Sequence, residues 1–446
     1  MFEIVRAGRE AALSCAVVAY ACTLHASGPP SPEDPSLATG VDRAVLVREA
    51  VARSPAVRAA KGRARAMERE GDAVSRLPPP SAMVQVWQVP LARPYAVGDA
   101  QMAMLGVEQE FPAPGARGER EAAKAALARE GDAMAADRAR QAASLADHAF
   151  ADYLEATQRR KVHVTHGDVG ERLLRVAEAA HSAGGPLVPV AQLEAELARV
   201  HADVASDEAR EDAARARINA LLGRPLDAPL GPPVAGGPEV PVWDATTLLA
   251  KARMTRPEIA GARAAHDAQA REHAATEREA SWPAFKVAGL YFAPVGPMPT
   301  HGYGVNASMT LPWLWGAAGA RRDVEREKLE ASAVEIDAQR RAVDVDIATA
   351  EATTRSAARR LDALVSQAKP AAQRAFDTAW TGYESARTDL TSTLLAERMV
   401  VEIDLDIVAA RATLDHALAD LDAAAGLAVP RQPLAVNATK GGSHGH

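Results

Sequence analysis

Two stretches decide the fold of this chain: LVREAVARSP at Leu46–Pro55 and LLAKARMTRP at Leu248–Pro257. Both carry apolar residues at helical spacing and both end in a proline. They lie roughly 200 residues apart, which is much longer than a single helix or a short solenoid repeat. The pair therefore indicates that the chain contains one large unit twice.

Further landmarks recur in the same order and at nearly the same offset in both halves. A proline is followed by Gly-Ala-Arg, and later a helical stretch ends at a glycine. Several landmarks in one order would not recur in this way by chance, so we interpret the chain as an internal duplication. The pairs are Pro112 and Pro312, Gly115 and Gly319, and the stretches 187–223 and 390–426.

Each half predicts the same series of elements: a helix, a strand hairpin, a long helix and a shorter returning helix. Asp42 and Asp244 are good N-caps for the two opening helices. Pro370 predicts a kink in the second long helix. The predicted helices span 42–77, 115–185 and 187–222 in the first half and 244–281, 313–386 and 390–425 in the second, and the strand hairpins span 81–111 and 284–312.

The lengths of these elements fit together. A long helix of this size would reach roughly 105 Å, and two shorter helices end to end would match it. The returning helices have apolar residues at coiled-coil spacing. Four strands cannot enclose a lumen, whereas twelve strands from three chains can. The sequence therefore predicts a mainly α-helical protein whose trimer builds a coiled-coil helical barrel and a twelve-stranded β-barrel.

Composition excludes several classes of protein. The chain is rich in alanine, has 4% aromatic residues and carries a formal charge of −7. This acidic balance argues against nucleic acid as a partner, because phosphate binding needs clustered basic residues. No metalloprotease, P-loop or hydrolase motif occurs, and the glycines of 302–307 lie inside a strand hairpin, unlike a dinucleotide fingerprint. We expect no enzyme activity, no cofactor and no resident metal.

The N-terminus resembles an export signal. Arg6 and Arg9 precede an apolar run over 11–24, so residues 1–26 are predicted to be a signal peptide. Cys22 follows a small residue, as in a lipoprotein signal, although Ala19 departs from the preferred leucine; the alternative is an ordinary cleavage near residue 26. A Pro-rich tether, 27–41, follows. No other stretch looks like a transmembrane helix, so a membrane crossing would require a closed barrel.

At this point the sequence resembles the TolC-type outer-membrane efflux protein family over nearly the whole mature chain. The resemblance rests on the paired openings of the repeats, a Trp-Pro before a strand, a turn into the last helix and the end of that helix. These are Ser54-Pro55, Arg256-Pro257 with the residues that follow it to 263, Trp282-Pro283, the turn 383–390 and the helix end 417–426.

The resemblance implies an exit duct in the outer membrane that extends into the periplasm as a homotrimer. Its partners would be outer-membrane lipid, a periplasmic adaptor and an inner-membrane pump of the RND type. The repeats would be 42–227 and 244–429, with an equatorial linker at 228–243 and a flexible tail at 430–446. The cargo could be heavy-metal cations, as in the cobalt–zinc–cadmium subgroup. The alternatives are a type I protein-secretion duct and an exported coiled-coil scaffold without a barrel.

The resemblance also assigns sites. Asp389 would form a carboxylate ring at the periplasmic gate, although an aspartate there is also a good N-cap. Ala386 departs from the family's usual glycine near this place. The adaptor would contact two tips, at Ser182, Gly184, Gly185 and Pro186 and at Ser385, Arg387 and Thr388.

Aromatic and histidine residues give weaker hypotheses. Trp87, Tyr291 and Phe292 are predicted to form interfacial belts, or else to pack at the junction of strands and helices. Trp313 and Trp315 are expected at that junction. The histidines at 163 and 166 share a helix face, where isolated histidines are usually solvated surface residues, so metal binding is the less favoured interpretation. His444 and His446 close the chain.

Overall fold

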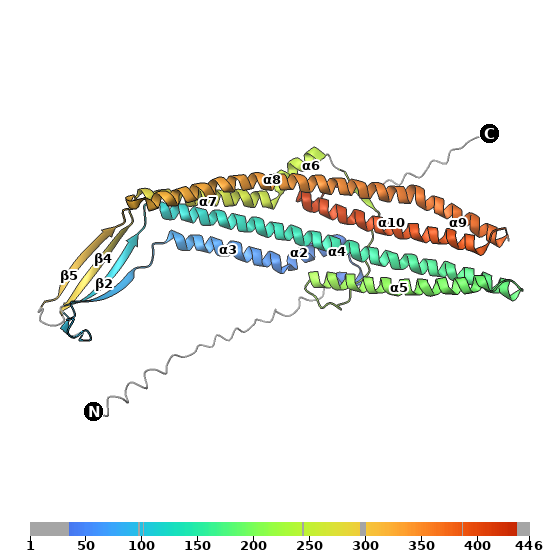
Figure 1. Cartoon of the computed structure of the whole chain (residues 1–446), viewed down its shortest axis with the longest axis horizontal. Helices are drawn as coiled ribbons and strands as arrows, with labels where there is room; N and C mark the ends of the chain where they lie inside the picture. Colours follow the sequence, from blue (N-terminus) through green and yellow to red (C-terminus); the bar gives the residue numbers. More distant parts are fainter. Residues whose placement is uncertain are drawn as a thin grey trace, which may run out of the picture.

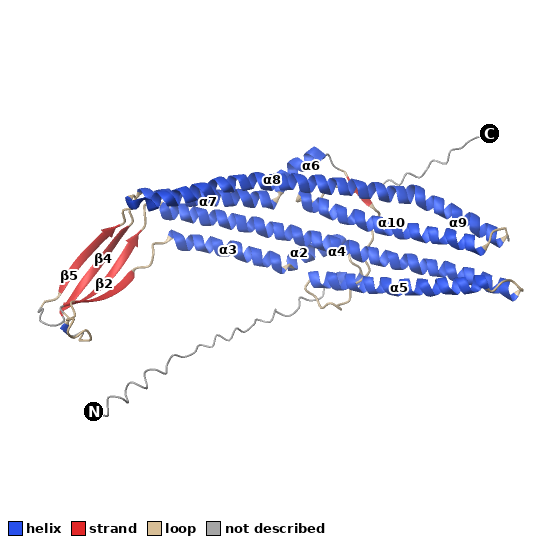
Figure 2. Cartoon of the chain, viewed as in Figure 1, coloured by secondary structure: helices blue, strands red, loops and turns tan. Residues whose placement is uncertain are grey.

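The described part of the chain is one elongated body with its main sheet at one end (Figure 1). Helices run side by side along the long axis and make up nearly all of the rest (Figure 2). The predicted signal peptide, Cys22 and the two C-terminal histidines lie outside the described residues. The computed structural model describes residues 35–434 apart from gaps at 97–98, 101, 243–244, 295–299 and 386.

The opening helix of the first repeat is broken in two, whereas the sequence predicts one helix over 42–77. α2 (Arg43–Arg53) begins after Asp42, whose carboxylate accepts two hydrogen bonds from the first turn. α3 (Pro55–Ser75) begins after Ser54, whose hydroxyl accepts one. The break follows from the proline that opens α3, because proline has no N–H to donate and disfavours a helical residue before it.

The second repeat is broken at the equivalent place. α6 (Ala245–Thr255) is followed by α7 (Pro257–Ser281), and Arg256 lies between them in an extended conformation. The predicted N-cap Asp244 lies in one of the gaps of the description. The same X-Pro step therefore ends the first helix in both repeats.

The long helix of the first repeat is the axis of the body. α4 (Ala116–Ser182) has 67 residues and thus a length of about 100 Å. α3 packs along the half nearer the sheet, and α5 (Val188–Leu221) along the other half. Alanines fill much of these contacts, and a Cβ added at Gly131 would lie 2.9 Å from Ala64 Cα. Small residues therefore let the helix axes approach closely.

The long helix of the second repeat is interrupted. A short turn, η2 (Leu314–Gly316), leads into α8 (Ala317–Ala363), which passes through a π-helical turn, η3 (Leu364–Ala368), into α9 (Lys369–Glu384). The π turn comes directly before Pro370, where the sequence predicts a kink. Proline cannot donate its backbone hydrogen bond, and the wider turn accommodates this loss.

The last long helix, α10 (Leu390–Ala425), joins the repeats because it packs against both α8 and α4. Two arginines bind the carbonyl oxygens at its C-terminus. Arg256 donates to Ala423 O at 3.1 Å and to Ala424 O at 2.7 Å, and Arg140 donates to Ala423 O at 3.1 Å. Positive charge is favourable there because it meets the negative end of the helix dipole.

The main sheet is built from both repeats. Its order is β1-β2-β4-β5 and every neighbouring pair is antiparallel, so the β2–β4 pair fuses the two hairpins. Within the described chain, β1 and β5 are the edges and have no further strand partner. The strands lie close to their predicted places, at β1 (Ser81–Trp87), β2 (Met102–Phe111), β4 (Phe285–Pro294) and β5 (Gly302–Met309).

A second, two-stranded sheet crosses the middle of the body. β3 (Glu239–Pro241), within the predicted linker, pairs with β6 (Arg431–Pro433). The prediction of a flexible tail is wrong for these residues, because Arg431 binds Asp422 and Val242 N donates to the carbonyl before β6. Residues 435–446 lie outside the described part.

The end of the predicted tether is also ordered. Residues Pro35–Thr39 form a short helix, α1, and Leu37 and Val41 are buried in a cluster with Tyr153. Apolar side chains thus draw this segment onto the body, so the prediction of a free tether is wrong from residue 35 onward. None of the helices in the described ranges is both long and apolar enough to span a membrane.

Candidate functional site: the strand sheet and the hairpin tips

One face of the main sheet is apolar although it is exposed. In the register, alternate residues of all four strands share this apolar face. Val84, Val305 and Tyr303 are 71%, 75% and 90% exposed. Gln109 also lies on this face, near the helices. The apolar members are Ala82, Val84, Val86, Ala103, Leu105, Val107, Phe111, Phe285, Val287, Gly289, Tyr291, Ala293, Tyr303, Val305, Ala307 and Met309.

The opposite face carries the charged residues of the sheet, and we call it the mixed face. Lys286 Nζ lies 3.6 Å from Glu108 Oε1 and 3.5 Å from Glu110 Oε2. Asn306 and Ser308 continue this face on β5. It also holds apolar side chains, since a Cβ added at Gly106 would lie 2.6 Å from a Leu290 methyl and 2.9 Å from Met83. The two faces therefore differ in charge, and a large sheet of this kind suits lipid on one side and water on the other.

The register separates the three aromatics that the sequence predicts to form interfacial belts. Tyr291 lies on the apolar face, where its hydroxyl is 2.5 Å from His301 Nδ1. Trp87 and Phe292 lie on the mixed face, because each is one residue out of step with the apolar positions. The structure thus keeps Tyr291 as a belt candidate and argues against the other two.

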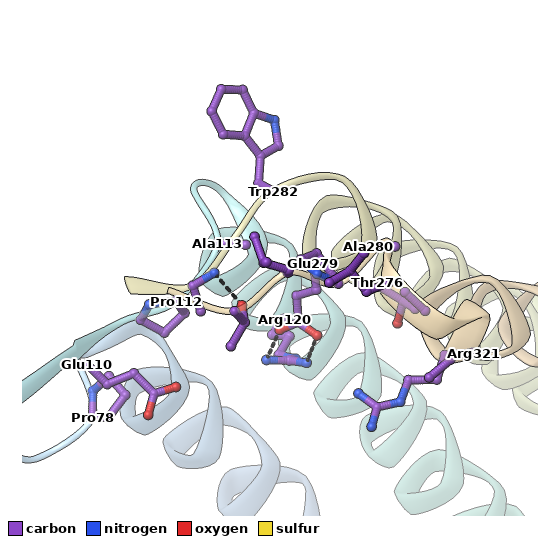
Figure 3. A pocket seen from close by; sticks show the side chains of 17 residues that line it. Pro78, Glu110, Pro112, Ala113, Arg120, Thr276, Glu279, Ala280, Trp282 and Arg321 are labelled. Atoms are coloured by element: carbon purple, nitrogen blue, oxygen red, sulfur yellow. Dashed lines mark hydrogen bonds and ion pairs between the residues drawn. The ribbon is translucent and has the colours of Figure 1, made fainter. Parts of the chain in front are cut away.

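A cavity of about 520 Å³ lies where the strands meet the helices (Figure 3). Arg120 Nη1 lies 2.6 Å from Glu279 Oε1, and Ala284 N donates to Thr310 Oγ1 at 2.9 Å. Trp282 projects away from this cavity in Figure 3 and is largely exposed. The first pair joins α4 to α7, and the second joins the residue before β4 to the residue after β5.

Trp313 and Trp315 lie at this junction too, where the sequence predicts them. Trp315 is 96% exposed and has a φ of 60°, a backbone angle that residues other than glycine rarely adopt. Gly316 follows with a φ of 73° and opens α8. The two tryptophans therefore border the sheet at its helical end.

The first hairpin tip closes α4 with glycines. Gly184 has a φ of 95° and its N–H donates to His181 O at 2.8 Å. Gly185 N donates to Ala180 O at 3.0 Å, and a Cβ on Gly185 would lie 2.8 Å from that oxygen. Ser182 Oγ donates to the carbonyl one turn earlier, and Pro186 follows the turn. The glycines are thus required by the turn itself.

The second tip is held by a glycine that sequence reasoning missed. Arg387 N and Thr388 N donate to Gly382 O at 2.8 and 3.1 Å. A Cβ on Gly382 would overlap Thr388 Oγ1, so a side chain there would displace the loop. Ser385 Oγ accepts a hydrogen bond from Arg387 Nε at 2.9 Å. A glycine inside a helix gives no signal of this contact, because Thr388 arrives only when the chain turns back.

Asp389 begins α10 as its N-cap. Its Oδ1 accepts a hydrogen bond from Ser392 N at 3.1 Å. Hydrogen bonds from Ser392 lower the pKa of Asp389, so its fully exposed carboxylate is ionised at neutral pH. The two tips lie side by side over one apolar cluster, in which Leu173 and Val190 of the first repeat contact Leu390 of the second.

The histidines at 163 and 166 are buried, so the expectation that they are solvated surface residues is wrong. His163 Nδ1 lies 2.6 Å from Asp207 Oδ2 on α5, and both side chains are buried. His166 Nδ1 contacts Glu397 Oε1 on α10, and both are again buried. In the described ranges, no three or more His, Cys, Asp or Glu side chains are arranged so that they could hold a metal ion.

Comparison with known proteins agrees with this architecture. Residues 248–427 match the family model described as outer membrane efflux protein. No curated protein matches the chain. The outer-membrane channel OprN is similar over 86% of this chain and 89% of its own, with a TM-score of 0.70 and 21% identity.

Two further solved structures share the fold. The outer membrane protein VceC from Vibrio cholerae covers 86% of this chain and 96% of its own, with a TM-score of 0.69 and 16% identity. CusC, whose structures concern folding and transmembrane channel formation, covers 90% and 98%, with a TM-score of 0.72 and 16% identity. The second repeat thus matches the family model of outer membrane efflux proteins, and the chain as a whole shares the fold of these three proteins.

Proposed function

We propose that this protein is the outer-membrane exit duct of a tripartite efflux system. The observation that carries this function is the exposed apolar face of a sheet whose two edge strands are unpaired within the described chain. Such a face would aggregate in water, whereas lipid would cover it. A coiled-coil scaffold without a barrel would have no use for it.

Closure of the barrel requires further copies. Four strands leave β1 and β5 with open edges, and three copies would supply twelve strands by pairing β5 of one copy with β1 of the next. A homotrimer would also continue the helices around a tunnel below the barrel. The mixed face, with Lys286 and its glutamates, would then line the water-filled interior.

The partners would meet the duct at the end opposite the sheet. A periplasmic adaptor would contact the exposed tips around Gly184 and Arg387 and would link them to an inner-membrane pump of the RND type. OprN is an outer-membrane channel and VceC an outer membrane protein of this fold, and the structures of CusC concern transmembrane channel formation. Their likeness supports the duct and leaves the cargo open, with heavy-metal cations as one candidate.

Two assignments extend the duct at its ends. Asp389 would form a ring of three ionised carboxylates at the narrow periplasmic end, in addition to capping α10. The N-terminal signal would direct export, and cleavage just before Cys22, in place of cleavage near residue 26, would leave Cys22 to carry a lipid that anchors the trimer. Labelling with radioactive palmitate checks the anchor, since the Cys22→Ser variant should lose the label that the natural chain takes up.

The mass of the detergent-extracted protein tests the function. We expect light scattering, with detergent counted separately, to give the mass of three chains for protein taken from the outer-membrane fraction. A water-soluble monomer or dimer would contradict the duct, because an unpaired sheet with this apolar face could not close. The coiled-coil scaffold would then replace it.

A further inference from the structure

Four side chains form a continuous chain of contacts between α4 and α10. His148 Nε2 lies 2.9 Å from Asp420 Oδ1, the Nδ1 atoms of His148 and His416 lie 2.7 Å apart, and His416 Nε2 lies 3.0 Å from Asp152 Oδ1. Asp152 and His148 belong to the first repeat, and the other two belong to the second. We call these four residues the histidine clasp.

The hydrogen bonds of the clasp fix its number of protons. An ionised carboxylate only accepts, so each Nε2 must carry a proton to donate to its aspartate. The contact between the two Nδ1 atoms needs one more proton, because two bare nitrogens would repel each other. Three protons on two imidazoles mean that one ring is charged. The complete set of contacts therefore exists with one imidazolium between two carboxylates.

The groups around the clasp leave this proton in place. On the Asp152 side, Arg217 of α5 lies 3.2 Å from the carboxylate, and Glu155 of α4 adds a negative charge near His416. From α8, Thr354 donates to Ala417 O, and a threonine carries no charge. On the other side of α4 and α10, Arg43 of α2 pairs with Asp147 and lies near Asp415 and Asp422, which Arg411 and Arg431 bind.

The position of the clasp gives it a role in the movement of the repeats. Toward the tips, α4/α5 and α9/α10 form two hairpins that meet where α4 packs on α10. The buried contact of His166 with Glu397 lies farther along the same seam. Histidines thus make two of the contacts that hold the hairpins together, whereas Arg398 of α10 and Glu196 of α5 join them by an ion pair that contains no histidine.

We propose that the histidine clasp is a proton-controlled lock that holds the two hairpins of each chain together and releases them when its shared proton is lost. Its effect on a duct rests on the function proposed above, whereas the lock itself does not. Without the proton, the two Nδ1 lone pairs face each other, and the central one of the three contacts between the repeats is lost. The hairpins can then separate toward their tips.

The electrostatics give the direction of this switch. The contact with Asp152 raises the pKa of His416 above its usual 6.5, in spite of partial burial. The contact with His416 lowers the pKa of Asp152 below 3.8. The stabilisation is therefore present between these two pKa values and is lost as the pH rises through that of His416. The lock is closed in mild acid and opens in mild alkali.

Conductance in planar bilayers tests the lock in the working trimer. We expect the conductance of the natural protein to rise in one step between about pH 5 and about pH 8, the range in which histidine changes its charge. The His416→Gln variant cannot hold the charge and should conduct at the higher level throughout. His273→Gln is the matched control, because His273 contacts Glu277 on its own helix and should keep the step. The same profile for the natural protein and His416→Gln would overturn the proposal.

Thermal unfolding of the detergent-solubilised protein tests the lock without any conductance. The melting temperature of the natural protein, measured relative to that of His416→Gln, should fall by about 2 °C as the pH rises over the same range. A difference that is constant with pH would overturn the lock. If neither the natural protein nor any variant conducts, the proposed duct is wrong, and the melting curves alone then test the lock. Should His416→Gln not assemble, Asp152→Asn replaces it, and both transitions should then move to lower pH.

Discussion

Ser54 and Arg256 stand before equivalent prolines in the two repeats, but their side chains contact different partners. Ser54 caps its own helix, α3. Arg256 is 5% exposed and binds the end of α10, and its Nη2 lies 2.8 Å from Glu258 Oε1 and 3.1 Å from Asp346 Oδ2. One buried guanidinium therefore connects α7, α8 and α10. The duplicated motif predicted the break but not this joint, because the partners of Arg256 are distant in sequence.

Replacing Arg256 should destabilise the second repeat. Arg256→Ala would leave Ala424 O without its side-chain donor, and Ala423 O and the partly buried Glu258 would keep only Arg140, at a cost of about 3 kcal/mol. For a chain of this size we expect the melting temperature to fall by about 3 °C. Arg253→Ala is the control, since Arg253 forms a half-exposed pair with Asp344 that should matter little. Equal falls in melting temperature for both variants would mean that the buried Arg256 stabilises the protein no more than the half-exposed Arg253 does.

Histidine burial shows where residue-level prediction stops. The spacing of His163 and His166 places both on one face of a helix, and the structure agrees. Their partners Asp207 and Glu397 lie on two other helices, α5 and α10. A sequence gives the face of a helix from its period, whereas burial depends on which helices pack there. For the same reason the histidine clasp had no signal in the sequence.

At the scale of elements, prediction worked where one period ran long and failed at interruptions. The extents of α4, α5 and α10 follow from long stretches free of proline between glycine or proline signals. The prolines at 55 and 257 were recognised as landmarks of the repeat but not as helix breaks. β6 was missed because three residues are too few for a period, and its partner β3 lies far back in the chain.

Neighbouring residues of β5 give an opposed pair of variants for the sheet. Val305 lies on the apolar face and Asn306 on the mixed face. In a lipid-covered barrel, Val305→Arg should cost about 2–4 kcal/mol, because an arginine would lie in the hydrocarbon region, and Asn306→Arg should cost far less. The measurement is the amount of heat-resistant trimer in the outer membrane. If Asn306→Arg is the more damaging of the two, the assignment of the faces is reversed.

At the scale of the whole molecule, the sequence predicted how the elements of one chain are arranged, whereas the assembly of several chains is inferred. The duplication and the matched helix lengths predicted a four-stranded sheet at one end of a long helical body, which the structure has. Barrel closure and the trimer remain proposals, because they concern contacts between copies. Only the open edges of β1 and β5 within the described chain point to them.

Asp389 belongs to this scale because its proposed ring needs three copies. Asp389→Ala should raise the conductance of the reconstituted duct and weaken its preference for cations, since three negative charges leave the narrow end. Hydrogen bonds from Ser392 lower the pKa of Asp389, which favours a charged ring at neutral pH. Asp389→Asn, which can still accept a hydrogen bond from Ser392 N, separates the charge from the cap. Unchanged conductance and selectivity in both variants would limit Asp389 to capping α10.

The pairing of β3 with β6 has a consequence for biosynthesis. β3 lies between the repeats, but its partner is among the last described residues, and Arg411 of α10 also donates to the carbonyls of Gly236 and Gly237. The waist of the body therefore stays incomplete until the second repeat has been synthesised and delivered through β6. The first repeat must wait for the second, so the two repeats are expected to mature together and not one after the other.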